Sequence, residues 1–91
     1  MSTKYSIQKN KENQKKHGVS FDDIDKFDWD TSITKEDTRY EYGEDRFISY
    51  GFVDSRLYVL VWTLRESDIR PISFRKANKR EVTRYEKDKF R

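Results

Sequence analysis

Residues 46–65 read RFISYGFVDSRLYVLVWTLR, and this stretch decides the fold of the chain. Its first part, residues 46–53, is rich in the aromatic and β-branched side chains that favour strands. Its second part, residues 56–65, is nearly all apolar, as expected for a central strand covered on both faces. Asp54 and Ser55 between them suit a tight hairpin turn. The stretch therefore predicts two paired antiparallel strands at the centre of a sheet.

The sequence that follows predicts another strand and then a helix. Residues 66–68 suit a turn, and residues 69–76 are predicted to form the third strand of the hairpin series. Pro71 has no N–H to donate to a neighbouring strand, so it requires an edge position or the start of the strand. Residues 77–88 follow a helical pattern of apolar and charged side chains.

The sequence before the hairpin predicts shorter elements. Residues 3–8 are predicted to form a short strand and residues 9–17 a polar helix. Gly18 fits the end of that helix, where a left-handed backbone conformation is often needed. A further strand is expected near residues 31–34, within an acidic and irregular segment.

Ser20 followed by Asp23 resembles a capping box that opens a short helix through Phe27. With the other elements, this predicts an α+β fold in which helices pack on an antiparallel sheet of about four strands. Ninety-one residues suffice for one domain, and we expect that domain to span residues 1–91.

Charge is distributed in separate blocks along the chain. Charged residues make up 41% of the sequence, but the apolar residues cluster into strand-like runs, which indicates a folded domain rather than a disordered chain. Residues 22–45 hold ten acidic residues against three basic ones, whereas residues 46–91 hold twelve basic residues against six acidic ones. Such separation favours a basic binding surface with an acidic region elsewhere, or a solvated surface of uneven charge.

The residue types limit the chemistry. The chain has no cysteine and one histidine, so a thiol nucleophile is excluded and no metal site or cofactor is expected. Arginine, lysine, His17, carboxylates and tyrosine remain, and they suit a phosphate-rich substrate, with RNA as the first candidate. The polar N-terminus lacks the apolar core of a signal peptide, and no apolar run is long enough to cross a bilayer. We therefore expect a cytoplasmic protein with no membrane partner.

Two arginines at predicted strand ends are the first candidates for phosphate binding. Arg65 ends the apolar strand and Arg75, with Lys76 beside it, ends the next one. A guanidinium on a rigid strand end can bind two phosphate oxygens through its planar fork. Alternatively, Arg65 only extends to solvent and Arg75 forms a surface ion pair with Glu81 or Glu86. A short turn between the two strands places these arginines near opposite ends of the hairpin.

Lys16 and His17 lie at the predicted end of the first helix. His17 is a candidate acid or base near neutral pH, and Lys16 a candidate for stabilising phosphate charge. A lone histidine at a helix C-terminus is more often structural. Trp62 and Tyr85 are candidates for stacking on bases but suit the core equally well.

Three blocks of sequence resemble the BrnT toxin family in order and spacing. They are KHGVSF at residues 16–21, EDRFISYG at residues 44–51, and ISFRKANKRE at residues 72–81, the last followed by Tyr85-Glu86. The resemblance extends from Lys9 to Glu86, and the first and last blocks form a specific combination.

The resemblance implies a RelE-like fold, with N-terminal helices against a curved antiparallel sheet and a C-terminal helix. It also implies the toxin of a type II toxin–antitoxin pair: a metal-independent endoribonuclease that cleaves RNA by attack of the 2′-hydroxyl and inhibits translation. The implied partner is a BrnA-like ribbon-helix-helix antitoxin, and operator DNA is bound only through the toxin–antitoxin complex. The implied catalytic set is Arg65, Arg75, His17 and Lys16, and the implied RNA-binding set is Trp62, Lys76, Lys79, Arg80 and Tyr85.

Two other functions fit the same residues. One is a non-catalytic basic module that binds nucleic acid or an acidic protein, which predicts salt-sensitive RNA binding without cleavage products. The other is a family member that has lost activity and persists as a partner-binding module. Toxicity on expression, relieved by the product of the neighbouring gene, distinguishes the ribonuclease from both.

Overall fold

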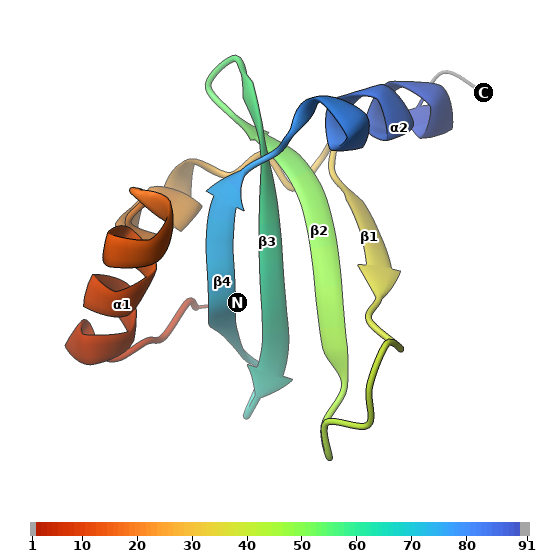
Figure 1. Cartoon of the computed structure of the whole chain (residues 1–91). Helices are drawn as coiled ribbons and strands as arrows, with labels where there is room; N and C mark the ends of the chain where they lie inside the picture. Colours follow the sequence, from red (N-terminus) through yellow and green to blue (C-terminus); the bar gives the residue numbers. More distant parts are fainter. Residues whose placement is uncertain (1, 90–91) are drawn as a thin grey trace.

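The computed structural model describes residues 2–89, which form one four-stranded antiparallel sheet with helices on its flank and faces (Figure 1). Strand order follows the sequence, β1-β2-β3-β4. The elements are α1 (Ile7–His17), the 3₁₀-helix η1 (Phe21–Lys26), β1 (Ile33–Glu36), β2 (Arg46–Val53), β3 (Arg56–Arg65), β4 (Asp68–Lys76) and α2 (Lys79–Lys89). The predicted α+β class, the sheet and the C-terminal helix are confirmed.

The central hairpin has the predicted bounds, because β2 and β3 begin and end where the apolar patterns do. Asp54 takes a left-handed backbone conformation in the turn between them. β4 begins one residue before the prediction, since Asp68 already pairs with Arg65 across a turn of two residues. Pro71 lies on β4, an edge strand, as its missing N–H requires.

The predicted strand over residues 3–8 is wrong. Within it, only Thr3 forms an isolated parallel bridge, to Ile69, and α1 begins at Ile7. The reason is local: the Ser6 hydroxyl accepts a hydrogen bond from the Lys9 backbone N–H at 3.1 Å, which caps the first turn of a helix. Gly18 ends α1 as predicted, with φ of 70° and its N–H donating to the Gln14 carbonyl.

The expected capping box at Ser20 is not formed. The Ser20 hydroxyl accepts from the Asp22 N–H at 3.0 Å, and the segment is a 3₁₀-helix rather than an α-helix. Three residues per turn align Phe21, Ile24 and Phe27 on one face, which explains why the sequence favours this tighter helix. The next strand is displaced from its predicted place and spans Ile33–Glu36.

Apolar side chains of β3 pack on both faces of the sheet, although its apolar sequence predicted that both faces would be fully covered. On one face, Leu60, Trp62 and Phe74 pack against the η1 segment. On the other face, Leu57 and Val59 pack against Ala77, just before α2, and against Val82 and Tyr85 on α2. α2 covers only the end of this second face, so the rest of it is open (Figure 1).

α1 lies along the edge of β4 and is joined to it by Asn13, which is 6% exposed. The Asn13 amide donates to the carbonyls of Val19 and Phe74, at 2.8 and 2.9 Å, and its oxygen accepts from the Phe74 N–H at 3.0 Å. The Asn13 side chain therefore fixes α1 against β4. The C-terminal end of α1 lies beside the C-terminal end of β4 (Figure 1). Among the described residues, no helix is long and apolar enough to span a bilayer.

Candidate functional site

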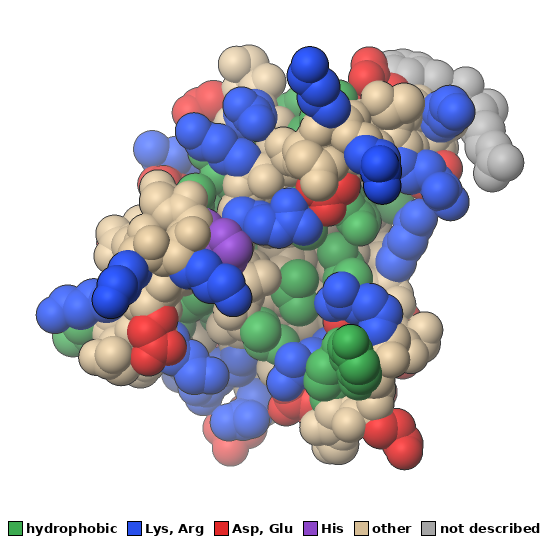
Figure 2. Space-filling model, in the orientation of Figure 1, with side chains coloured by type: hydrophobic (Ala, Val, Ile, Leu, Met, Phe, Trp, Pro, Cys, Tyr) green, Lys and Arg blue, Asp and Glu red, His purple; other side chains and the backbone are tan. Residues whose placement is uncertain are grey.

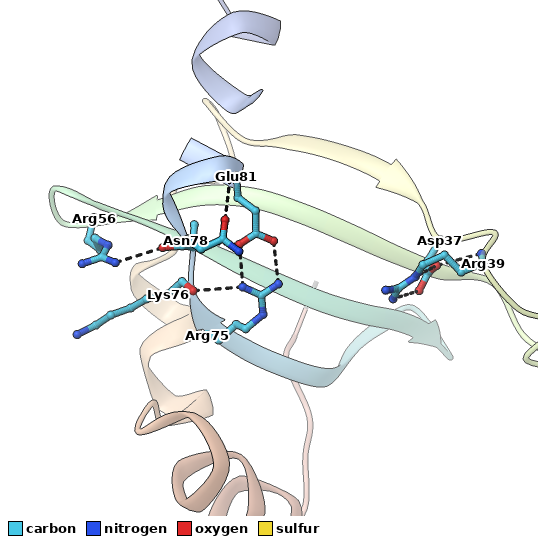
Figure 3. Close-up of polar contacts among 8 residues, drawn as sticks. Asp37, Arg39, Arg56, Arg75, Lys76, Asn78 and Glu81 are labelled. Atoms are coloured by element: carbon cyan, nitrogen blue, oxygen red, sulfur yellow. Dashed lines mark hydrogen bonds and ion pairs between the residues drawn. The ribbon is translucent and has the colours of Figure 1, made fainter. Parts of the chain in front are cut away.

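Arg75 is held at the end of β4 by two strong hydrogen bonds. Its Nη1 and Nη2 groups donate to Oε1 and Oε2 of Glu81, both at 2.8 Å, and Nη1 also donates to the Lys76 carbonyl at 3.3 Å (Figure 3). The alternative ion pair with Glu81 is thus confirmed. Charge-assisted pairing of this kind raises the pKa of Arg75 and lowers the pKa of Glu81. Arg75 is a fixed cation.

Glu81 also builds the start of α2. The Asn78 N–H donates to Oε1 of Glu81 at 2.9 Å, and the Glu81 N–H donates to Oδ1 of Asn78 at 2.8 Å. This reciprocal capping box explains why the helix begins at Lys79 rather than at residue 77 as predicted. The pattern Asn-x-x-Glu was the sequence signal for it. One carboxylate therefore fixes both the helix and the arginine.

His17 ends α1 on the side of the molecule where Arg75 lies. It is half-buried, and burial together with the positive charges of Lys16 and Arg75 lowers its pKa below 6.5. These influences favour the neutral form of its imidazole. Figure 2 shows the single histidine among Lys and Arg side chains on the face that α2 partly covers. The structure brings His17, Lys16 and Arg75 together.

A cleft of about 200 Å³ lies between α1 and β4, next to these basic side chains. Lys16, His17 and Ser73 are among the residues that line it. Ser73 lies opposite Val61 on β3, two positions before Arg75 along β4, so the cleft follows the same face of the sheet.

Arg65 lies elsewhere. Arg75 is opposite Val59, and Arg65 is six residues further along β3, which corresponds to about 20 Å. The Arg65 side chain is 61% exposed, and its Nη2 lies 3.7 Å from Glu44 Oε1. The antiparallel hairpin places the C-terminal ends of β3 and β4 at opposite ends of the sheet, so the structure does not bring Arg65 and Arg75 to one phosphate.

The two aromatic candidates are buried. Trp62 is 7% exposed and its indole N–H donates to the Ser49 hydroxyl at 2.8 Å. Tyr85 is 6% exposed and its hydroxyl donates to the Thr31 carbonyl at 2.7 Å. These contacts correspond to the core role that the sequence left open for both residues.

The basic candidates near the start of α2 are exposed. Lys76, Lys79 and Arg80 all reach solvent around the Arg75–Glu81 pair. The Lys76 side chain points away from Arg75, so it widens the positive surface rather than sharing a ligand with Arg75 (Figure 3).

Sequence reasoning missed Tyr50 and Arg39. Tyr50 pairs with Val59 in the strand register and therefore lies on the face that carries Arg75. Burial, and then the negative charge of Glu81, raise the pKa of Tyr50. Alternation along β2 would have placed Tyr50 on this face once the hairpin register was fixed.

Arg39 lies in the loop that joins β1 to β2, apart from the Arg75–Glu81 pair (Figure 3). Its Nε and Nη2 groups donate to the carboxylate of Asp37 at 2.8 and 2.9 Å (Figure 3), and Asp37 is 5% exposed. These hydrogen bonds hold the pKa of Asp37 well below its usual range. The two residues are only two positions apart, so the spacing Asp-x-Arg was the local sequence signal for this pair.

The grouped side chains support proton transfer and anion stabilisation. A neutral imidazole can accept a proton, and adjacent guanidinium and ammonium groups can stabilise charge on a phosphate. Within residues 2–89, no three His, Asp or Glu side chains are grouped so as to hold a metal ion.

Comparison with known families gives one match. The family described as "Ribonuclease toxin, BrnT, of type II toxin-antitoxin system" matches residues 5–81. Neither the curated proteins nor the solved structures contain a match. The family match spans most of the chain, including α1, the whole sheet and the start of α2. The chain therefore belongs to the BrnT family of ribonuclease toxins of type II toxin–antitoxin systems.

Proposed function

We propose that this toxin is a metal-independent endoribonuclease that uses the 2′-hydroxyl of its RNA substrate as the nucleophile. The observation that carries the proposal is the placement of His17 at the end of α1 near Arg75, a cation that Glu81 holds in place. A base that is unprotonated near pH 7 and a guanidinium for the phosphorane are the two groups that such a reaction needs.

The roles follow from the chemistry. His17 takes the proton of the 2′-hydroxyl while the 2′-oxygen bonds to phosphorus and the bond from phosphorus to the 5′-oxygen breaks. The leaving 5′-oxygen takes a proton from solvent, and the products are a 2′,3′-cyclic phosphate and a 5′-hydroxyl. Arg75 and Lys16 stabilise the negative charge that accumulates on the phosphorane.

Arg75 retains donors for this task despite its ion pair. A guanidinium has five N–H donors, and the Glu81 and Lys76 contacts use three of them. The Nε–H group and the second hydrogen of Nη2 form no hydrogen bond with a described residue. A phosphate can therefore bind them while Glu81 holds the side chain in place. Lys76, Lys79 and Arg80 would bind neighbouring phosphates. Arg65 is too distant to share the phosphate of Arg75.

The test is cleavage of an RNA in EDTA by the purified chain, with the same RNA carrying one 2′-deoxyribose at the mapped cleavage site as the control. We expect cyclic-phosphate and 5′-hydroxyl ends from the first substrate and no cut at the modified position in the second. Cleavage that persists at the 2′-deoxy position, or that is lost in EDTA and restored by a divalent cation, contradicts the mechanism.

The proposal extends to the cell. We infer a BrnA-like ribbon-helix-helix antitoxin as the partner, operator binding only through the complex, inhibition of translation, and action in the cytoplasm. Family membership supports this because type II systems pair a toxin with a protein antitoxin. Growth arrest on induction, relieved by co-expression of the neighbouring gene, is the expected result.

One observation favours a second candidate, a non-catalytic binding module. Both arms of Arg75 engage Glu81, as they would in a purely structural ion pair. This candidate predicts RNA binding that weakens with salt and leaves the RNA intact. Product analysis in the cleavage experiment separates the two functions directly.

A further inference from the structure

A cavity of about 230 Å³ lies between α2 and strands β1 and β2, next to the Arg75–Glu81 pair. Its apolar walls come from Ile33, Tyr50 and Tyr85, and Glu81 lines it as well. Pockets for drug-sized ligands occupy about 300–1,000 Å³, so this one has room for a single ring system. Aromatic and aliphatic walls of this kind suit a flat ring.

The rim of the cavity is positively charged. It carries Lys35, Arg80 and Arg84. Asp88 is the rim's acidic residue, and its Oδ2 lies 3.4 Å from Lys35 Nζ and 3.5 Å from Arg84 Nε. Arg80 is exposed and forms no ion pair with a described residue. A ligand that fits these charges therefore has a negative group outside the cavity.

The Tyr50 hydroxyl supplies a polar group inside. Tyr50 is half-buried, and its hydroxyl bonds no described side chain or carbonyl, although it lies near the carboxylate of Glu81. An unpaired hydroxyl beside a carboxylate can hydrogen-bond the edge of a heteroaromatic ring, accepting or donating as the ring requires.

We propose that this cavity binds one nucleobase of the RNA substrate, with the phosphate of that nucleotide on Arg80 and Arg84. The inference rests on the proposed function, since it takes RNA as the substrate. It makes Tyr50 a positioning residue that sets which base lies next to the phosphate held by Arg75.

The experiment measures nucleotide binding separately from cleavage. The ¹⁵N-labelled full chain is titrated with each of the four nucleoside 5′-monophosphates and with inorganic phosphate. We expect at least one nucleotide to shift the amide signals of Ile33 and Tyr50 and to bind more tightly than inorganic phosphate. Equal affinity for all four nucleotides and for phosphate overturns the proposal.

Point variants test whether the nucleotide binds in this cavity. Ile33→Trp fills the cavity and should reduce nucleotide affinity to that of inorganic phosphate, whereas Ile7→Trp adds the same side chain at a position that is 77% exposed and should leave it unchanged. Tyr50→Phe preserves the shape and should weaken binding about three- to tenfold, as for one lost hydrogen bond. Unchanged affinity in both Ile33→Trp and Tyr50→Phe contradicts the site.

Failure of this inference is distinguishable from failure of the ribonuclease proposal. If nucleotides bind but no RNA is cut, the cavity stands and the catalytic proposal falls. If RNA is cut with the same base preference and the same KM by wild type and Tyr50→Phe, the catalytic proposal stands and the cavity is not a base site.

Discussion

The two ends of the β3–β4 hairpin carry an arginine each, but the surroundings of these arginines differ. Arg75 is half-buried, bonded at two points to a carboxylate that also caps a helix, and close to a histidine. Arg65 is 61% exposed, with one long contact to Glu44. An arginine at the end of a strand is thus a positioned group in one place and an exposed surface charge in the other.

The largest expected effect is on cleavage by the two arginine variants. Arg75→Ala should lower kcat/KM by about 10²–10³, the usual cost of losing one group that stabilises transition-state charge. Arg65→Ala should lower it by about threefold at most, because an exposed and distant cation acts through screened charge. The measurement is single-turnover cleavage at fixed salt with proteins of matched thermal stability. Equal losses would show that both arginines serve the reaction.

The second effect concerns the protonation of His17. Because its pKa is lowered below 6.5, the base form persists into mildly acidic solution, and cleavage should reach half its maximum below pH 6.5. Below that point the rate should fall about tenfold per pH unit. His17→Gln should abolish this dependence along with most activity.

His17 also reports on its neighbours, because the single histidine gives one imidazole signal in proton NMR. Removing the nearby charge in Arg75→Ala should raise the pKa of His17 toward 6.5, while Arg65→Ala should leave it unchanged. An equal change in both variants would contradict the difference between the two ends of the hairpin.

The third effect is on stability. Glu81→Gln should reduce the free energy of unfolding by about 1 kcal/mol at pH 7, because the charge-assisted bonds to Arg75 weaken. The pKa of Glu81 is lowered from 4.5, so its contribution is complete above pH 4.5 and is lost as pH falls through the lower value in the folded state. Denaturant unfolding at pH 7 and at pH 3 measures this.

The loss of unfolding free energy that Glu81→Gln causes should be smaller at pH 3 than at pH 7. Glu86→Gln is the matched control, because Glu86 is exposed on the same helix. A deficit that is the same at both pH values would mean that the charge of Glu81 contributes nothing.

The smallest effect is expected at the Arg65 end. Glu44 contacts Arg65 at 3.7 Å and Arg46 at 3.1 Å, and Glu44→Gln should change the free energy of unfolding by less than about 0.5 kcal/mol. Added salt should remove even that difference. A loss of unfolding free energy above about 1 kcal/mol would show that the Glu44 ion pairs stabilise the fold as much as the Arg75–Glu81 pair does.

The parts of the fold that the sequence predicts well are those with a strong local signal. The apolar stretches of β2 and β3, the proline of β4 and the glycine after α1 each specify their own conformation. The failed strand over residues 3–8 had no such signal, and the hydroxyl of Ser6 was enough to start a helix there.

The candidate site was harder to predict because it joins residues that are distant in sequence. His17 lies near Arg75 because α1 packs against β4, where Asn13 bonds Phe74 across 61 residues. A polar residue in the middle of a polar helix gives no sign of such a contact. The separation of Arg65 from Arg75, in contrast, follows from hairpin geometry alone.

The outer edge of β4 has a consequence for the free toxin. The segment before α1 bonds both backbone groups of Ile69, Pro71 has no N–H, and Asn13 bonds both backbone groups of Phe74. Unpaired strand edges are the templates on which proteins assemble into aggregates. With the backbone of β4 bonded at Ile69 and Phe74 and lacking a donor at Pro71, this edge offers few free backbone groups to which another strand could add.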